Sequence, residues 1–257
     1  MVMKLSSSDK ARITFSVAAS RDTDVLASTE KRNLSGFMAM MVKRGVPSEV
    51  DPISFKSVGS DLMTFSGRAF DDGTAFTAGY KVLAEGGRVY TKGNRIHVED
   101  ADEAVLIFSC ATDYYHGDAW KESVLRTINA ASEKSYAALL EAHLTDYQEI
   151  FKRVDLSLGS SRPAALPTDV RLEALNDEFD LSGTDRDPQL YALHFHFGRY
   201  LLISSSRKGY FPPGYIYWCP DLFSEWFGGH ADDVNEQMNY WAADVCNMPE
   251  MLEPFFD

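Results

Sequence analysis

Apolar and polar positions alternate along the first hundred residues in short stretches, a pattern typical of half-buried β-strands. Residues 12–17 show the alternation most clearly, and residues 104–111 form a continuous apolar run of a length suited to a buried strand. Turn sequences rich in Gly, Asp and Asn separate the stretches. The predicted strands are residues 12–17, 61–70, 74–83, 87–91, 95–98 and 104–111, and their regular spacing favours a β-sandwich.

After residue 115 the apolar period becomes that of helices. Asp118 is predicted to cap a helix that runs to Ser132, and Glu133 to begin a second helix that ends near Val154. The second helix has an apolar face that consists of Tyr136, Leu139, Leu140, His143, Tyr147 and Ile150.

A linker rich in Pro and Ser is predicted for residues 159–167, with further helices beyond it. Thr168 is predicted to cap a short helix, and Pro254 to end the apolar tail. The remaining predicted elements are an apolar helix from Asp187-Pro188 to Ser206, an aromatic-rich loop over residues 209–229 and a helix over residues 233–247.

Charge and cysteine content narrow the function classes. The formal net charge is −13, which disfavours a nucleic-acid partner and suits a neutral ligand such as a sugar. The three cysteines are too few and too scattered for a disulfide framework, and no spacing indicates zinc, so we expect no metal and no cofactor. No apolar stretch is long enough for a membrane span or for the core of a signal peptide. The chain as written is therefore expected to be cytoplasmic, without a membrane partner, although its localisation stays open.

Candidate chemistry gathers between residues 218 and 241, where carboxylates, amides and aromatic rings are frequent. A sugar site needs carboxylates to move protons, aromatic faces for the sugar ring and amides for its hydroxyl groups. Composition alone favours an ordinary aromatic core for this region over a sugar platform. Likewise, His194 and His196 are expected to be packed and hydrogen-bonded, and Ser204, Ser205 and Ser206 to bond helix carbonyls.

The order of several short motifs is more specific than any one of them. They are Gly67-Arg-Ala, Ala101-Asp, Ala111-Thr-Asp-Tyr, His143-x-x-Asp146, Phe151-x-Arg-Val-Asp-Leu-Ser-Leu-Gly159, Pro167-Thr-Asp-x-Arg171-Leu172, Asp187-Pro-x-Leu190, Phe197-Gly-Arg-Tyr-Leu-Leu-Ile-Ser-Ser-Ser-Arg207, Asn235-x-x-Met238-Asn-Tyr-Trp241-x-Ala-x-x-x-Asn247 and Glu253-Pro254. In this order the chain resembles glycoside hydrolase family 95, the inverting α-L-fucosidases, from near residue 12 to its C-terminus.

The resemblance implies an α+β chain: a β-sandwich portion, a helical linker and the first helices of an (α/α)6 barrel. The corresponding domains are an incomplete sandwich over residues 1–115, a linker over 116–185 and the start of the barrel over 186–257. Family members are several times longer, so this chain resembles a part of one.

The resemblance also assigns roles to individual residues. The family orients its attacking water with an Asn-x-Asn pair, which maps onto Asp233-Val-Asn235. Asn235 matches, whereas Asp233 replaces an amide by a carboxylate that only accepts hydrogen bonds and so either acts as a base or misorients the water. Ala231 stands where the family has a histidine, next to His230, and the family's general acid and distant aspartate are expected beyond Asp257. The candidate substrate-binding residues are Trp218, Trp226, His230, Asn239 and Trp241.

The expected function is therefore inverting hydrolysis of terminal α-linked L-fucose from oligosaccharides or glycoconjugates, with little activity from this chain alone. L-galactose differs from L-fucose only by a hydroxyl group, so the choice between the two sugars stays open. The alternative is a non-catalytic carbohydrate-binding or interaction protein derived from the family. Exposed apolar faces of the first barrel helices are expected to cause self-association.

Overall fold

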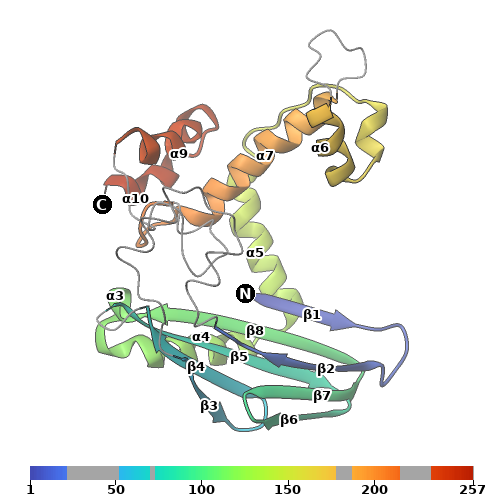
Figure 1. Cartoon of the computed structure of the whole chain (residues 1–257), viewed down its shortest axis with the longest axis vertical. Coiled ribbons are helices and arrows are strands. Elements are labelled where there is room, and N and C mark those ends of the chain that lie inside the picture. The colour runs from blue at the N-terminus through green and yellow to red at the C-terminus, as the bar shows by residue number, and fades with distance from the viewer. Residues whose placement is uncertain (22–51, 70–72, 178–186, 215–232, 257) are drawn as a thin grey trace. The chain divides into compact units, whose positions relative to one another are not determined.

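The fold is given by a computed structural model that describes residues 1–21, 52–69, 73–177, 187–214 and 233–256. The chain divides into two compact units, and the division falls between His143 and Leu144. We call the described part of residues 1–143 the β unit and that of residues 144–256 the helical unit. Together they make an α+β chain, as the sequence predicts (Figure 1).

Two antiparallel sheets make up most of the β unit, an arrangement compatible with a β-sandwich. The five-stranded sheet has the spatial order β1 (Val2–Ser6), β8 (Glu103–Thr112), β5 (Ala75–Glu85), β4 (Leu62–Arg68) and β3 (Ser54–Val58). The three-stranded sheet has the order β2 (Ile13–Ala18), β7 (Arg95–Ala101) and β6 (Arg88–Lys92). Inward-facing apolar residues of both sheets form one buried cluster: Met63, Tyr80, Val82, Ile96, Val98, Ala101 and Ala104.

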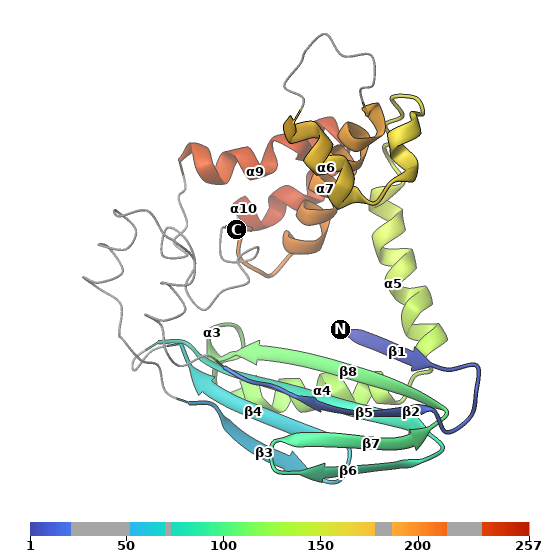
Figure 2. The same ribbon diagram turned by 45° about the vertical axis from the view of Figure 1, so that its right-hand side comes forward.

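Helix α4 (Trp120–Ser132) covers the other face of the five-stranded sheet, against β5 and β8 (Figure 2). Val124 and Ile128 of the helix are buried in a second apolar cluster with Leu62 and Ile107. The helix packs closely because β5 carries Gly79 at the contact, where a Cβ atom would lie 2.8 Å from Cδ1 of Ile128. Strand β5 is thus buried on both faces, which accounts for its largely apolar sequence.

The turn from β5 to β6 requires glycine. Gly86 and Gly87 have φ angles of +70° and +65°, in the left-handed region that other residues rarely adopt. A Cβ atom on Gly87 would also lie 2.2 Å from the carbonyl oxygen of Glu99, so no larger residue fits. The register in which β6 pairs with β7 is set instead by the two-residue turn Gly93-Asn94, which places Lys92 opposite Arg95.

The six predicted strands are all present, and β6 and β7 form a hairpin. Two strands were not predicted. β3 is short, polar and exposed at the edge of its sheet, and β1 pairs with the distant β8. Neither carries a clear local alternation, because pairing rather than local sequence determines a short edge strand.

The helical unit contains the last turns of α5 (Tyr136–Phe151) and a series of helices after it. These are η2 (Arg162–Ala165), α6 (Thr168–Asp177), α7 (Pro188–Ser205), α9 (Val234–Val245), η4 (Pro249–Leu252) and α10 (Glu253–Phe256). Its apolar core is Ile150, Leu202, Ile203, Tyr240, Ala243, Cys246, Met248 and Met251.

Several predicted helix ends are wrong. Asp118 does not cap α4, because it lies inside the 3-10 turn η1 (Gly117–Ala119), and Ala119 precedes the helix without a side-chain cap. Helix α5 begins three residues after Glu133 and ends before Val154. Thr168 is the first residue of α6 rather than its cap.

One further prediction of the helical region is wrong. Pro254 does not end the apolar tail, because it lies in the first turn of α10, where its missing N–H has no helical partner to lose. The residues predicted to share one face of the second helix all lie in α5. Ile150 is buried among them, and Leu140 is exposed.

Among the described residues, no helix combines the length and the apolar character that a membrane span needs. Loop residues 209–214 are described, and the remainder of the predicted aromatic loop lies outside the described residues.

Candidate functional site

The N-terminal end of α9 carries the two residues that the resemblance links to the attacking water. Asp233 precedes the helix in an extended conformation, and its side chain makes no capping hydrogen bond. Its backbone carbonyl accepts from the N–H of Gln237 at 3.4 Å, so its main chain begins the helix. Asp233 is exposed, and Asn235 is half-buried one residue into the helix.

Helix α9 presents three different sides. Glu236, Tyr240 and Ala243 are buried against the core of the helical unit. Asn235 and Asn239, one turn apart, share a half-buried flank.

The third side of α9 is exposed and apolar. Trp241 lies there with 66% of its surface accessible. At about 100° per residue, Trp241 is about 120° round the helix from Asn235. The helix therefore brings Asn239 close to Asn235 and turns Trp241 away from both. The other exposed apolar residues on this third side of α9 are Val234, Met238 and Val245.

Asn239 has a protein partner for its amide group. Its Nδ2 atom lies 2.8 Å from the backbone carbonyl oxygen of Pro213, in the loop that follows α7. A carbonyl oxygen only accepts, so the side chain must direct its NH2 group to the loop. Pro213 and Gly214 are buried. The predicted role of Asn239 in substrate binding stays a prediction, with one donor of the amide already engaged.

The buried side of α9 is fixed by a relay of hydroxyl groups. Ser206, fully buried at the end of α7, lies 2.7 Å from the carbonyl oxygen of Met251 and 2.9 Å from the hydroxyl of Tyr240. Because the serine proton goes to the carbonyl, Tyr240 must donate to Ser206. Burial raises the pKa of Tyr240, which keeps the phenol protonated and able to donate. The orientation of α9 about its own axis is set in this way.

Helix α9 ends in a motif that requires a left-handed residue. Asn247 has a φ of +53°, and its N–H donates to the carbonyl of Asp244. The N–H of Met248 reaches back to the carbonyl of Ala243 at 2.8 Å. These two bonds form a Schellman motif, in which asparagine tolerates the left-handed conformation. Asn247, the last residue of the sequence motif that begins at Asn235, therefore ends helix α9.

A buried arginine ties α7 to the end of α5. Arg199 is 1% exposed and donates to the carbonyls of Phe151 and Val154, both at 2.7 Å. Its guanidinium group also lies over the ring of Phe151. A cation at a helix C-terminus satisfies carbonyls that have no helical partner and complements the helix dipole.

His196 completes this contact. Its Nδ1 atom lies 3.3 Å from a guanidinium nitrogen of Arg199. Its Nε2 atom lies 3.4 Å from the backbone nitrogen of Leu156 and 3.3 Å from the carboxylate of Asp155. His196 is therefore a packed, hydrogen-bonded histidine, as predicted, whereas His194 is exposed.

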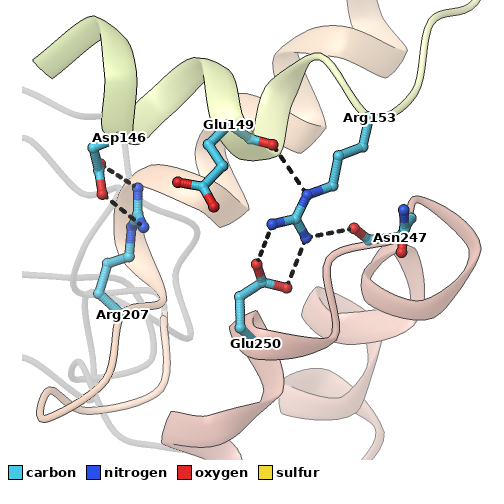
Figure 3. Close-up of polar contacts among 6 residues, drawn as sticks. All are labelled: Asp146, Glu149, Arg153, Arg207, Asn247 and Glu250. Atoms are coloured by element: carbon cyan, nitrogen blue, oxygen red, sulfur yellow. Dashed lines mark hydrogen bonds and ion pairs between the residues drawn. The ribbon is translucent and has the colours of Figure 1, made fainter.

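Two more arginines hold α5 to the segments around it, and Figure 3 shows both. Arg153 forms two bonds to the carboxylate of Glu250, at 2.7 and 3.0 Å, and donates to the carbonyls of Glu149 and Asn247. The contact with Arg153 lowers the pKa of Glu250.

Arg207, at the other end of Figure 3, reaches Asp146 at 2.8 Å and also donates to the carbonyl of Ile203 near the end of α7. Because Asp146 is exposed, this ion pair is expected to contribute less than the buried contacts of Arg199.

A fourth arginine joins α6 to the start of α7. Asp187 precedes α7 and accepts from the N–H of Leu190, as an N-cap does. The same carboxylate receives two bonds from Arg171, at 2.6 and 3.1 Å, and one from Ser161. The bonds from Arg171, followed by the bond from Ser161, lower the pKa of Asp187.

The four arginines and their partners form what we call the arginine frame: Arg153, Arg171, Arg199 and Arg207 with Asp146, Asp187, Asn247, Glu250 and the carbonyls at the end of α5. Sequence reasoning did not predict this frame. The one indication of the frame in the sequence is that charged motif residues lie inside otherwise apolar helices, as Arg199 does in α7. Nearly all the motifs after residue 143 contribute to the frame or to the Ser206–Tyr240 relay, so most of the family likeness lies in residues that hold the fold.

Three of the predicted substrate-binding residues, Trp218, Trp226 and His230, lie outside the described residues. Over the ranges that the structure describes, no group of three or more His, Cys, Asp or Glu side chains is arranged to hold a metal ion. What the described site offers chemically is an exposed carboxylate and a half-buried amide at one helix end, beside a flank that carries a second amide.

Comparison with known proteins agrees with the motif order. Residues 135–257 match the model of the glycosyl hydrolase family 95 catalytic domain. Alpha-L-fucosidase 2 of Arabidopsis thaliana is 36% identical over 186 residues, which cover 68% of this chain and 22% of the relative. Probable alpha-fucosidase A of Aspergillus niger is 33% identical over 62% of this chain and 21% of the relative, and that of Aspergillus oryzae 31% over 58% and 20%. The chain spans about a fifth of the length of these relatives, and it is a partial member of glycoside hydrolase family 95 that matches the catalytic domain from residue 135 onward.

Proposed function

We propose that this chain carries the water-orienting segment of a glycosidase that hydrolyses terminal α-linked L-fucose with inversion. The observation that carries the proposal is the pairing of Asp233 and Asn235 at the start of α9, inside the segment that matches the family catalytic domain. The relatives are named as fucosidases, which supports L-fucose as the sugar that is released. The substrate would be a fucosylated oligosaccharide or glycoconjugate. No nucleic-acid or membrane partner is proposed.

The chemistry follows from the two side chains. The amide of Asn235 can donate to and accept from a water molecule, which fixes its direction of attack. The carboxylate of Asp233 has no capping bond to the helix, so its oxygens remain suited to accept a proton from that water. An inverting mechanism needs a general acid about 6.5–9.5 Å away, on the other side of the sugar. That acid is not assigned within this chain.

Turnover by the chain alone should be small, because loss of a general acid typically lowers the rate by about 10²–10⁴-fold. We also propose the domain limits 1–115, 116–185 and 186–257, with the last range as the start of an (α/α)6 barrel.

The direct test is incubation of the purified chain with 2′-fucosyllactose and detection of released fucose by NMR. We expect slow release of the β-anomer, the product of inversion, and a further loss in Asn235→Ala and Asp233→Ala. Fast release by the wild-type chain would contradict the expected low activity. Equal slow release by wild type and both variants would contradict the roles of Asp233 and Asn235.

The alternative is a carbohydrate-binding protein without catalysis. It is favoured by Asp233, which replaces an amide of the family pair by a group that only accepts hydrogen bonds. Calorimetric titration with L-fucose separates the two. Binding with no release from 2′-fucosyllactose over days would support the alternative over the enzyme.

Self-association is expected from the exposed apolar side of α9. Val234, Met238, Trp241 and Val245 are between 43% and 80% exposed and follow one another at spacings of four, three and four residues. Such a continuous stripe favours contact with another apolar surface. Light scattering should detect oligomers, and Trp241→Lys with Val245→Lys should shift them toward monomer. A monodisperse wild-type monomer would contradict this expectation.

A further inference from the structure

The loop after α7 meets α9 on the flank where Asn235 lies. The described residues of this loop, 207–214, run from the half-buried Arg207 to the buried Pro213 and Gly214. Its described contact with α9 is the bond from Asn239 to the carbonyl of Pro213. Because Asn239 is one turn from Asn235, their Cβ atoms are about 5–6 Å apart along the same flank. The carbonyl of Pro213 therefore approaches the same flank within one helical turn of Asn235.

The two prolines limit how the backbone of this loop can bond to α9. Pro212 and Pro213 have no N–H to donate, so neither residue can bond to α9 through its own backbone nitrogen. Gly209 has a φ of +82°, which turns the chain but does not attach it. At the other end, Lys208 reaches Glu253 at 3.2 Å through a side chain that is largely exposed, so this pair is weak.

We infer that Asn239 is a positioning residue that anchors the Pro213–Gly214 loop beside Asn235 and so forms one wall of the sugar site. The inference rests on the proposed function for the identity of the ligand, an L-fucosyl group. Asn239 acts through the loop: its NH2 group holds the carbonyl of Pro213, and the loop limits the space next to the Asn235 amide.

The test uses the full chain and compares Asn239→Leu, which keeps the shape of the side chain but has no NH2 group, with Asn239→Gln, which keeps the NH2 group. Gln237→Leu is the matched control, because it makes the same kind of change at an exposed position on a different side of α9. Amide hydrogen exchange is followed at residues 208–211 and at Gly214, the loop positions that have an N–H.

We expect Asn239→Leu to raise exchange in this loop about fivefold, the effect of one lost hydrogen bond, with the exchange of α9 itself unchanged. Asn239→Gln should restore much of the protection, and Gln237→Leu should leave it unaltered. Equal exchange in Asn239→Leu and wild type would overturn the anchoring contact.

The second readout is the affinity for L-fucose and the release of fucose from 2′-fucosyllactose. Both should fall in Asn239→Leu and recover in Asn239→Gln. If exchange rises while affinity and release stay at the wild-type level, the loop is anchored but does not form the site, and the inference is wrong. If the wild-type chain neither binds nor releases fucose, the proposed function fails, and the exchange data still decide the anchoring contact.

Discussion

The two units bury different kinds of side chain. In the β unit the buried polar residues are Thr77 and Ser123, both uncharged, and the rest of its buried set is apolar. In the helical unit, Arg171, Arg199 and Glu236 are buried together with the hydroxyl of Ser206. The β unit is therefore held by apolar contact between sheets and helix α4, whereas the helical unit combines a smaller apolar core with the arginine frame.

The difference has a physical cause in secondary structure. Strands that pair on both sides satisfy their backbone groups within the sheet, as in β5 between β4 and β8. Each helix instead ends with carbonyls that have no partner inside the helix. Where such an end is partly buried, as at Phe151 and Val154, a side-chain donor can replace water, and Arg199 has this role.

The comparison also shows how a family motif should be interpreted. The motifs after residue 143 look chemical because they are rich in Arg, Asp and Asn. In the structure most of those residues bond to one another or to helix ends. A likeness carried by such residues is strong support for the fold, and weaker support for catalysis.

The largest expected effect is on the helical unit, from Arg199→Met. The variant removes both donors to the carbonyls of Phe151 and Val154, and methionine cannot replace them. At 1–3 kcal/mol for each buried group left unsatisfied, the free energy of unfolding should fall by about 4 kcal/mol. Chemical denaturation followed by circular dichroism measures the change. Arg199→Lys keeps one ammonium group for the two acceptors, so its free energy of unfolding should lie between those of Arg199→Met and wild type. A loss below about 1 kcal/mol would mean that the arginine is not structural.

An apolar truncation should have the corresponding effect on the β unit. Ile96 is fully buried between the two sheets, and Ile96→Ala leaves a cavity there. The expected loss in the free energy of unfolding is about 3 kcal/mol. Urea denaturation of the variant is the measurement, with Ile96→Val as the milder control at about 1 kcal/mol. Tolerance of alanine at this position would show that the sheets do not depend on this core.

Acid should destabilise the helical unit. Bonds from Arg171 lower the folded-state pKa of Asp187, and bonds from Arg153 lower that of Glu250. A carboxyl group whose pKa is lowered in the folded state stabilises that state fully at pH values above its unfolded pKa. The stabilisation is lost as the pH falls through the folded-state pKa. The helical unit should therefore lose stability below about pH 4.

The acid effect is measured by hydrogen exchange at a series of pH values. The double variant Asp187→Asn with Glu250→Gln should be less stable at pH 7 and show a shallower dependence on pH below 4. An unchanged pH dependence in the double variant would show that these two carboxyl groups do not control the acid response.

The smallest effect is expected at the exposed ion pair of the β unit. Arg88 lies 2.7 Å from Glu99 on the outer face of the three-stranded sheet, with a side chain that is mostly exposed. Solvent screens such a pair, so Arg88→Ala should leave the denaturation midpoint unchanged within error. A clear destabilisation would weaken the contrast between the two units, because a polar contact would then matter to the β unit as well.

Local sequence predicted the fold well where each element carries its own pattern. The alternation in β2 and the apolar run of β8 led to the right strands, and the apolar composition of α7 led to the right helix. It failed for β1 and β3, whose strand character depends on distant partners. Helix ends were also missed, as at Asp118, because a 3-10 turn precedes α4 at this position.

The candidate site was predictable only in part. The resemblance selected Asp233 and Asn235, and both lie at the start of α9. Helical spacing predicts that Asn239 shares the flank of Asn235, but not that its amide bonds to Pro213, a contact between segments 26 positions apart. The arginine frame likewise joins residues 16 to 97 positions apart in sequence, which no local pattern encodes.

The central claim is that the arginine frame holds the helical unit and leaves the β unit to its apolar core. Hydrogen exchange of Arg199→Met against wild type tests it most directly. The account predicts faster exchange in α7, α9 and the end of α5, with unchanged exchange in strands β4, β5 and β8. Exchange that stays at the wild-type rate in the helices, or that rises equally in both units, would contradict it.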